Sequence, residues 1–184
     1  MLTLADYEQS PAQIQFWIEE VQRRAGGSLA IQVTNRWRDQ EVAPDQATLA
    51  DVQAGKVPLA KVNASAYDTV GIDSFQALLA PLLIDNPTLE RRVLESDLAT
   101  QMLAGTDELG LVGLAVLPTD LRKPLGSRAR WCGARDYRGV RMGVGEGEVA
   151  TATVTALGAA PVSTIAGEPL RGLDGLDLDL AKSR

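Results

Sequence analysis

Residues 134–159 read ARDYRGVRMGVGEGEVATATVTALGA, and the fold depends on this stretch. Its polar start ends at Gly139, a typical turn residue. Residues 140–144 (VRMGV) alternate apolar residues with small or charged ones, as a strand does. Glu146 opens a helical run with a small apolar face, closed by Gly158 as its C-terminal cap. We expect a ligand to be held at the glycine-rich corner between strand and helix.

The glycines at this corner, Gly143, Gly145 and Gly147, look like a phosphate-binding loop at first sight. We reject nucleotide binding, because the spacing differs from the dinucleotide fingerprint and no Lys-Ser/Thr pair follows. Glu146 and Glu148 also place negative charge at the start of the helix, where it would repel a phosphate.

Composition excludes several classes of protein. The chain has 184 residues, enough for one sizeable core or for one and part of a second. Its net charge of −6 argues against nucleic acid as a partner. Histidine is absent, which removes the commonest general base and the commonest metal ligand. Cys132 is the single cysteine, so the chain has no internal disulfide.

Other local patterns carry less information. No apolar run approaches the roughly 20 residues that a membrane span needs. Asp174, Asp177 and Asp179 resemble a calcium loop only superficially, because the glycine and the distal glutamate of that loop are missing. We therefore predict no metal and no cofactor. The sequence shows no signal peptide after Met1, so we expect a cytosolic protein or one whose leader was removed.

The amino-terminal part predicts a βαβαβ pattern. Apolar strands are expected at residues 2–5, 29–33 and 57–62, the last weakened by Pro58. Ser10 as N-cap and Pro11 at the first turn start the first helix, with Gln13 completing a capping box, and residues 44–54 form the second helix. Such alternation implies a mostly parallel sheet flanked by helices, and ligands bind outside the carboxyl ends of its strands.

Residues 57–117 complete the predicted first domain, 1–117. A long helix is expected from Pro87, with Leu98 and Met102 turned inward, and residues 111–117 (LVGLAVL) are expected as a buried strand. We assign residues 118–139 to a basic crossover and 140–184 to a partial second α/β domain that ends in a strand at 160–165, a helical turn at 167–172 and an irregular tail.

The crossover is crowded with positive residues, and Arg141 follows on the next strand. They are Arg122, Lys123, Arg128, Arg130, Arg135 and Arg138. In an acidic chain this crowding indicates an anion site, and a solvated basic loop is the alternative.

An ordered set of segments resembles the DctP-type substrate-binding proteins of tripartite ATP-independent periplasmic (TRAP) transporters. The segments are FWIEEVQRRAGGSLAIQV (16–33), VQAGKVPLAKV (52–62), FQALLAPLLI (75–84), DYRGVRMGV (136–144), TALGAAPV (155–162) and GLDG (172–175). The resemblance covers nearly the whole chain. It implies a type II periplasmic-binding-protein-like α/β fold in which two domains close over a small organic acid and pass it to a membrane permease.

Two departures from the family pattern matter. Family members are usually about half as long again, so this chain resembles a first domain and the beginning of a second. The strand after the D-x-x-G turn normally ends in an arginine that pairs bidentately with a carboxylate, and Gly143 stands at that place. Either Arg130 or Arg141 takes the anion instead, or the ligand lacks the usual carboxylate.

The resemblance implies a set of residues in contact with the ligand. The set is Asn63, Tyr67, Phe75, Arg130, Arg141, Gly143 and Glu146. Structural alternatives stand beside these roles: a loop cap for Asn63, core packing for Tyr67 and Phe75, and a carboxylate at a helix N-terminus for Glu146.

Three functions from different classes remain at this point. The resemblance implies an extracytoplasmic solute-binding protein that works with TRAP permease subunits, located in the periplasm. A regulatory or assembly module built from the same domain is the alternative. An α/β enzyme ranks third, because no nucleophile–base pair is visible without histidine. We also expect self-association, since a partial second domain should leave residues such as Val144, Val154 and Leu157 uncovered.

Overall fold

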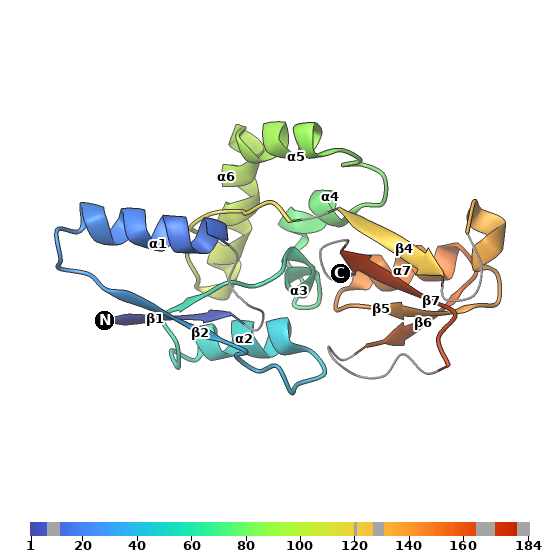
Figure 1. Ribbon diagram of the computed structural model, residues 1–184, viewed down its shortest axis with the longest axis horizontal. Coiled ribbons are helices and arrows are strands. Elements are labelled where there is room, and N and C mark those ends of the chain that lie inside the picture. Colours follow the sequence, from blue (N-terminus) through green and yellow to red (C-terminus); the bar gives the residue numbers. More distant parts are fainter. Residues whose placement is uncertain (7–11, 120, 127–130, 165–171, 180–184) are drawn as a thin grey trace.

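The computed structural model describes residues 1–6, 12–119, 121–126, 131–164 and 172–179 (Figure 1). Two sheets lie toward opposite ends of the long axis, with α3 between them and α5 above. The strands are β1 (Leu2–Asp6), β2 (Ile31–Asn35), β3 (Leu59–Ala60), β4 (Arg122–Gly126), β5 (Arg141–Val144), β6 (Ala160–Ser163) and β7 (Gly175–Asp179). The α-helices are α1 (Ala12–Arg24), α2 (Pro44–Gln53), α3 (Ala64–Asp68), α4 (Gln76–Leu79), α5 (Pro87–Leu94), α6 (Asp97–Ala104) and α7 (Glu148–Ala156).

The first sheet is fully parallel, with strand order β2-β1-β3. Leu4 at its centre pairs with Val33 on one side and with Leu59 on the other. Helix α1 packs on this sheet because its apolar residues recur every three or four positions, and Ile14 and Ile18 are buried against Leu4. The predicted start signals of this helix at Ser10 and Pro11 lie outside the described residues, and nothing is described of the Gln13 side chain.

The other two elements of the predicted βαβαβ unit are also present. Helix α2 begins at Pro44, as its sequence predicts, and buries Leu49. Strand β3 is shorter than the predicted strand at 57–62, because Pro58 has no N–H to donate to the ladder. The prediction of a parallel sheet with helices is therefore confirmed for this part of the chain.

A layer of short helices follows, built on Ile72, Phe75 and Met102. The long helix predicted from Pro87 is wrong, because the chain breaks between α5 and α6. Ser96 causes the break: its hydroxyl accepts a hydrogen bond from the Leu98 N–H at 3.3 Å and so caps a new helix. Leu98, expected inside, is 47% exposed.

The buried strand predicted at 111–117 is also wrong. These residues form no regular element, and Val112 and Leu114 are exposed. Gly113 passes so close to α6 that a Cβ there would lie 2.7 Å from Leu103 Cδ2. The apolar run therefore packs along α6. Composition alone does not distinguish such a segment from a buried strand.

The second sheet has the order β4-β7-β5-β6. Strand β5 pairs in parallel with β6 and with β7, and β4 pairs antiparallel with β7. Two strands were missed: β4 lies in the predicted crossover, and β7 lies in the predicted irregular tail. The helical turn predicted at 167–172 lies largely outside the described residues.

The second sheet has its own core, formed by Met142, Val144, Val154 and Ala159. The expectation that this part leaves Val144 and Val154 uncovered is wrong, since they are 2% and 4% exposed. Large exposed apolar side chains lie mainly elsewhere, at Phe16, Leu82 and Val112 among others. The division into domains at 117 and 140 stays a prediction. Among the described residues, no helix is both long enough and apolar enough to cross a membrane.

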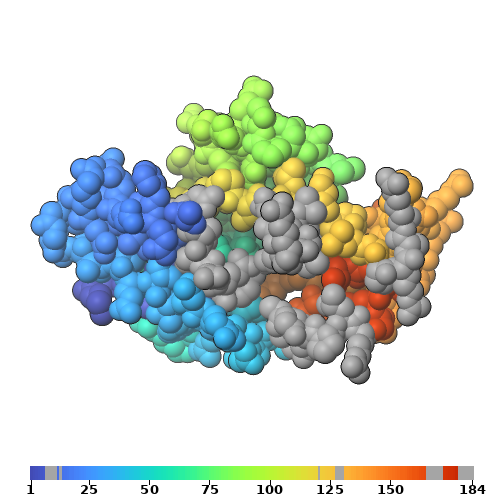
Figure 2. Space-filling model, viewed as in Figure 1, coloured from blue at the N-terminus to red at the C-terminus, as the bar shows by residue number. Residues whose placement is uncertain are grey.

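Figure 2 shows the same arrangement as a surface. The amino-terminal part and the carboxyl-terminal part occupy opposite sides, and the α5–α6 part spans the top between them. We call the part with β1–β3 the amino-terminal half and the part with β4–β7 the carboxyl-terminal half. Contacts between these two halves therefore position the residues in the middle of the molecule.

Candidate functional site

Polar groups gather at the carboxyl edge of the first sheet. Asp6 ends β1 and is fully buried, and Lys61, just after β3, places its Nζ 3.3 Å from Asp6 Oδ1. Asn63 follows two residues later, at the start of α3. The carboxyl ends of parallel strands meet at one edge, where α/β proteins bind ligands. This edge is the candidate site.

Asp45, in the first turn of α2, is the most buried member of this group apart from Asp6. Its Oδ1 accepts a hydrogen bond from the Asn63 backbone N–H at 3.0 Å, and its Oδ2 accepts one from Asn63 Nδ2 at 2.7 Å. Burial raises the pKa of Asp45 to about 7 despite these donors, with a further contribution from the Glu146 charge. The sequence missed Asp45, which there looks like an ordinary acidic residue in a helix's first turn.

Glu146 enters this edge from the other sheet. It follows Val144, the last residue of β5, and its carboxylate oxygens accept hydrogen bonds from the backbone N–H groups of Asp45 and Gln46, both at 3.0 Å. Glu146 thus places a carboxylate at a helix N-terminus, which was the structural alternative given for it. The helix is α2, however, and not α7, which follows Glu146 in the sequence. Burial raises its pKa, and the two backbone donors oppose that rise.

A second contact crosses between the sheets in the opposite direction. Asp68, the last residue of α3, accepts a hydrogen bond from the Val149 N–H of α7 at 3.1 Å through Oδ2. Its Oδ1 is buried with no hydrogen-bond partner among the described residues. Gly147 presses against α3, and a Cβ there would lie 3.0 Å from Ser65 Cβ. No motif in the sequence pointed to Asp68.

Tyr67 and Phe75 lie together, with ring centroids 4.8 Å apart. Phe75 is 4% exposed in the core of the helical layer, which is the packing role that the sequence left open for it. Tyr67 is half-buried, and burial raises the pKa of its hydroxyl, with a smaller contribution from the Asp45 charge. Tyr67 therefore lies near the polar edge, and Phe75 supports it from behind.

Gly143 is buried in the middle of β5. A Cβ there would meet Leu176 Cδ2 at 2.5 Å and Thr164 Cγ2 at 2.7 Å. The space that a side chain at position 143 would need is filled by these neighbours. An arginine at this place has no room in the structure as it stands.

Of the two predicted cationic residues, Arg141 lies away from the other candidates. Arg141 lies at the amino end of β5, exposed, and a Cβ on Gly172 would lie 3.0 Å from its Nη1. Two residues of strand lie between it and Val144, a distance of about 10 Å along the chain. Arg130 lies outside the described residues.

Among the described residues, Arg122 brings a positive charge to the glycine-rich corner. A Cβ on Gly145 would lie 3.6 Å from its Nη2. Its Nε donates to Asp177 Oδ2 at 2.9 Å, so β7 holds the side chain across the end of the sheet. The sequence placed Arg122 only in a general basic crowd, because β4 and β7, which position it, were not predicted.

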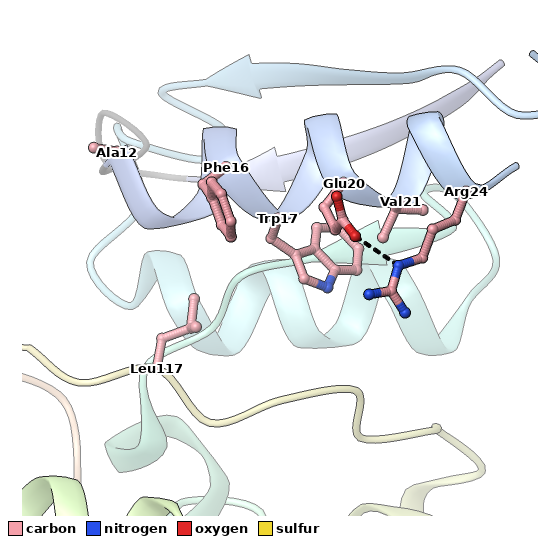
Figure 3. Close-up of a pocket in the computed structure, with 7 residues that line it drawn as sticks. All are labelled: Ala12, Phe16, Trp17, Glu20, Val21, Arg24 and Leu117. Atoms are coloured by element: carbon pink, nitrogen blue, oxygen red, sulfur yellow. Dashed lines mark hydrogen bonds and ion pairs between the residues drawn. The ribbon is translucent and has the colours of Figure 1, made fainter. Parts of the chain in front are cut away.

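An apolar groove lies elsewhere, along α1 (Figure 3). The groove has a volume of about 780 Å³. Figure 3 shows Phe16, Trp17 and Leu117 turned toward it, with Glu20 and Arg24 paired to each other at its rim. None of the residues assigned to ligand contact lines this groove. Among the described residues, no group of three or more His, Cys, Asp and Glu side chains is placed to hold a metal ion.

Comparison with known proteins supports the fold and the family. Solved structures of TRAP periplasmic solute-binding proteins superpose on this chain, and each of the three described below covers 96% of it. One from Xanthobacter autotrophicus Py2, with bound β-D-galacturonate, has 21% identity and a TM-score of 0.82. One from Ochrobactrum anthropi, with its own C-terminus bound in the ligand-binding pocket, has 20% identity and a TM-score of 0.80. The sugar acid binding protein of Advenella mimigardefordensis DPN7T, in complex with galactonate, has 19% identity and a TM-score of 0.80.

The chain spans 61%, 57% and 58% of the length of these three relatives, respectively. No curated protein matches it. The model of the bacterial extracellular solute-binding protein family 7, DctP, matches residues 5–174, which is most of the chain. The type II binding-protein-like α/β fold is therefore confirmed, and the chain belongs to family 7 of the bacterial extracellular solute-binding proteins.

Proposed function

We propose that this chain captures a small organic anion of the carboxylate type between its two sheet-bearing parts, for uptake by a TRAP-type secondary transporter. The observation that carries the proposal is the family match over residues 5–174. Relatives hold galacturonate, galactonate and D-erythronate, all small acids rich in hydroxyl groups. A binding protein of this kind works in the periplasm, delivers its ligand to membrane permease subunits and performs no chemistry on it.

The polar edge suits such a ligand. The amide of Asn63 and the hydroxyl of Tyr67 can donate to and accept from sugar hydroxyls. Asp45 and Glu146 accept hydrogen bonds, as a polyhydroxyl ligand requires. These four groups lie at the carboxyl edge where both sheets meet.

Arg122 is the cation that we propose for the ligand carboxylate. Its position beside Gly145 supports this role, and its planar guanidinium suits bidentate pairing. Arg141 and Arg130 remain the alternatives from the sequence. The crowding of Leu176 and Thr164 over Gly143 supports an anion contact that does not start from position 143.

Calorimetric titration with galacturonate and galactonate tests the function. We expect binding of at least one acid, and about tenfold weaker binding after Arg122→Ala, because a charge-assisted contact to the ligand carboxylate is lost. Arg91→Ala on exposed α5 is the matched control and should leave affinity unchanged. Arg141→Ala and Arg130→Ala tell which cation acts if Arg122→Ala has no effect. The absence of binding to any hydroxylated acid in a wider panel would contradict the proposal.

Self-association remains part of the proposal for the second sheet. Its described apolar residues are largely covered, and the open strand edges are β4 and β6. Lys123 and Pro124 on β4 make that edge a poor template for pairing. Light scattering of the purified chain distinguishes a monomer from an edge-paired dimer.

A further inference from the structure

Among the described helices, α2 and α7 begin without a side-chain cap from their own N-cap residue. Ala43 precedes α2 and Gly147 precedes α7, and neither residue has a side-chain oxygen to accept the first N–H groups. Other helices cap themselves: Asn86 Oδ1 accepts from the Leu89 N–H of α5, and the Ser96 hydroxyl accepts from α6. Because the first N–H groups of a helix have no intrahelical partner, α2 and α7 need acceptors from elsewhere.

Each of these two helices takes its acceptor from the opposite half of the chain. Glu146, beyond β5, accepts from the first turn of α2, a hundred residues earlier. Asp68, at the end of α3, accepts from the first turn of α7. Both acceptors are carboxylates, which the positive end of a helix dipole favours. The exchange is reciprocal: the amino-terminal half caps the helix of the carboxyl-terminal half, and the reverse.

We propose that Glu146 and Asp68 form a reciprocal latch that couples closure of the two halves to the capping of α2 and α7. A cap inside one segment survives any movement between the halves. These two caps are lost together when the halves separate, because each carboxylate leaves with the half that carries it. Opening is therefore cooperative, and partly open forms with one cap intact are disfavoured.

The surrounding contacts keep the latch releasable. Two features of the described arrangement oppose closure: the Glu146 charge lies near buried Asp45, and Asp68 Oδ1 is buried without a partner among the described residues. Gly147 allows the approach, since a side chain there would meet Ser65 and Asp68. The closed form thus combines directed hydrogen bonds with unfavourable buried charge, so a modest free energy separates it from the open form. This inference rests on the two caps and holds whether or not a sugar acid is the ligand.

Amide hydrogen exchange on the full chain, followed residue by residue by NMR, tests the latch. Glu146→Ala removes the acceptor for the Asp45 and Gln46 amides. A latch predicts that this change also speeds exchange at Val149, on the other half, about fivefold, the factor that loss of a typical N-cap corresponds to. Asp68→Ala should likewise speed exchange at Asp45 and Gln46. Exchange within α1 should stay constant and shows that the variants remain folded.

The same hydrogen-exchange measurement provides the controls and the result that would contradict the latch. Glu19→Ala removes an exposed carboxylate on α1 and should change none of these rates. Glu146→Gln and Asp68→Asn keep an acceptor oxygen and should give smaller effects than the alanine variants. In the double alanine variant the two acceleration factors should multiply, because both caps stabilise the same closed form against one opening step. Acceleration confined to the helix that loses its own acceptor would overturn the proposal.

Discussion

Glu146 Oε1 lies 3.0 Å from the backbone nitrogen of Asp45, which places two carboxyl groups from distant parts of the chain in one buried corner. No arginine contributes to the pKa of either group, and the one cation that lowers the pKa of Asp45, Lys61, has the smallest effect on it. The corner therefore prefers at least one proton near neutral pH. This preference makes the stability of the molecule depend on pH.

We predict that stability falls as pH rises from about 4 to about 7. Asp45 has a pKa of about 7 when folded against an ordinary value of 3.8, so folding binds a proton in this window. The favourable contribution is complete below pH 4 and is lost as pH rises through the folded pKa, on the order of 4 kcal/mol in total. The raised pKa of Glu146 acts in the same direction.

Urea denaturation at pH 5 and pH 8 measures this dependence. Asp45→Asn removes the ionisable group, so the variant should be more stable than the parent at pH 8. Its free energy of unfolding should also differ much less between pH 5 and pH 8 than that of the parent. Asp107→Asn, on the exposed turn after α6, is the control and should keep the parent's slope. Parent stability that rises between pH 5 and pH 8 would show that the corner holds both charges without cost.

Gly147→Ala should separate α7 from α3. Gly147 has φ +119°, a conformation that only glycine adopts readily, and a Cβ would lie 3.1 Å from the Ser65 carbonyl oxygen. We expect a loss of about 2 kcal/mol or more in the free energy of unfolding. Gly158→Ala, also at positive φ but with no neighbour closer than 3.4 Å, isolates the backbone effect from the clash. Equal losses in both variants would mean that the contact with α3 contributes nothing.

The sequence predicted the first sheet well because its signals are local. Ile14 and Ile18 at helical spacing, Pro44 at a helix start and the apolar strand around Leu4 each specify their element within a few residues. The predictions failed where contacts with a neighbouring element decide the structure, as two examples show. The run at 111–117 follows α6 through Gly113, and β7 forms only because β4 and β5 lie on either side of it.

The candidate site was less predictable than the fold, for the same reason. Asn63 and Glu146 were named from the family resemblance, but their partner Asp45 lies 18 residues from one and 101 from the other. Arg122 depends on β4 and β7, which are paired 55 residues apart. Asp68 has no motif at all, because its role is to cap a helix that begins 80 residues later. Long-range contacts of this kind leave no pattern in one sequence.

Asp51 should be the strongest polar anchor of the loop after β2. Its buried carboxylate accepts hydrogen bonds from Arg38 Nε at 2.7 Å, Lys56 Nζ at 2.8 Å and Trp37 Nε1 at 3.1 Å. Hydrogen bonds from Arg38, then Lys56, hold the pKa of Asp51 well below its usual range. The stability it provides is present above pH 4 and is lost only as pH falls toward its folded pKa.

Asp51→Asn should cost about 2 kcal/mol at pH 7, because two charged donors lose their counter-charge, although both are partly exposed and can be solvated. Thermal unfolding followed by circular dichroism at pH 7 measures the loss. Asp39→Asn, in a pair with exposed Arg36, should cost much less. If the two variants unfold at the same temperature, the ion pairs of Asp51 contribute no more to stability than the exposed Arg36–Asp39 pair.

Substitutions at Gly143 test whether this chain can accommodate an arginine at the position where the family pattern has one. Leu176, Thr164 and Leu173 fill the space over its Cα, each within 2.9 Å of a Cβ built there. Gly143→Ala should therefore destabilise the chain by about 1–3 kcal/mol through overpacking, and Gly143→Arg by more, without strengthening binding of galacturonate. Paired substitution of Gly143→Ala with Leu176→Ala should recover part of the loss of the single glycine change, because the methyl group then has room. Unfolding free energies of the three variants, measured beside galacturonate titrations, check this. An arginine at 143 that folds normally and tightens sugar acid binding would show that the side chains above Gly143 yield easily and that the anion contact from β5 can be restored.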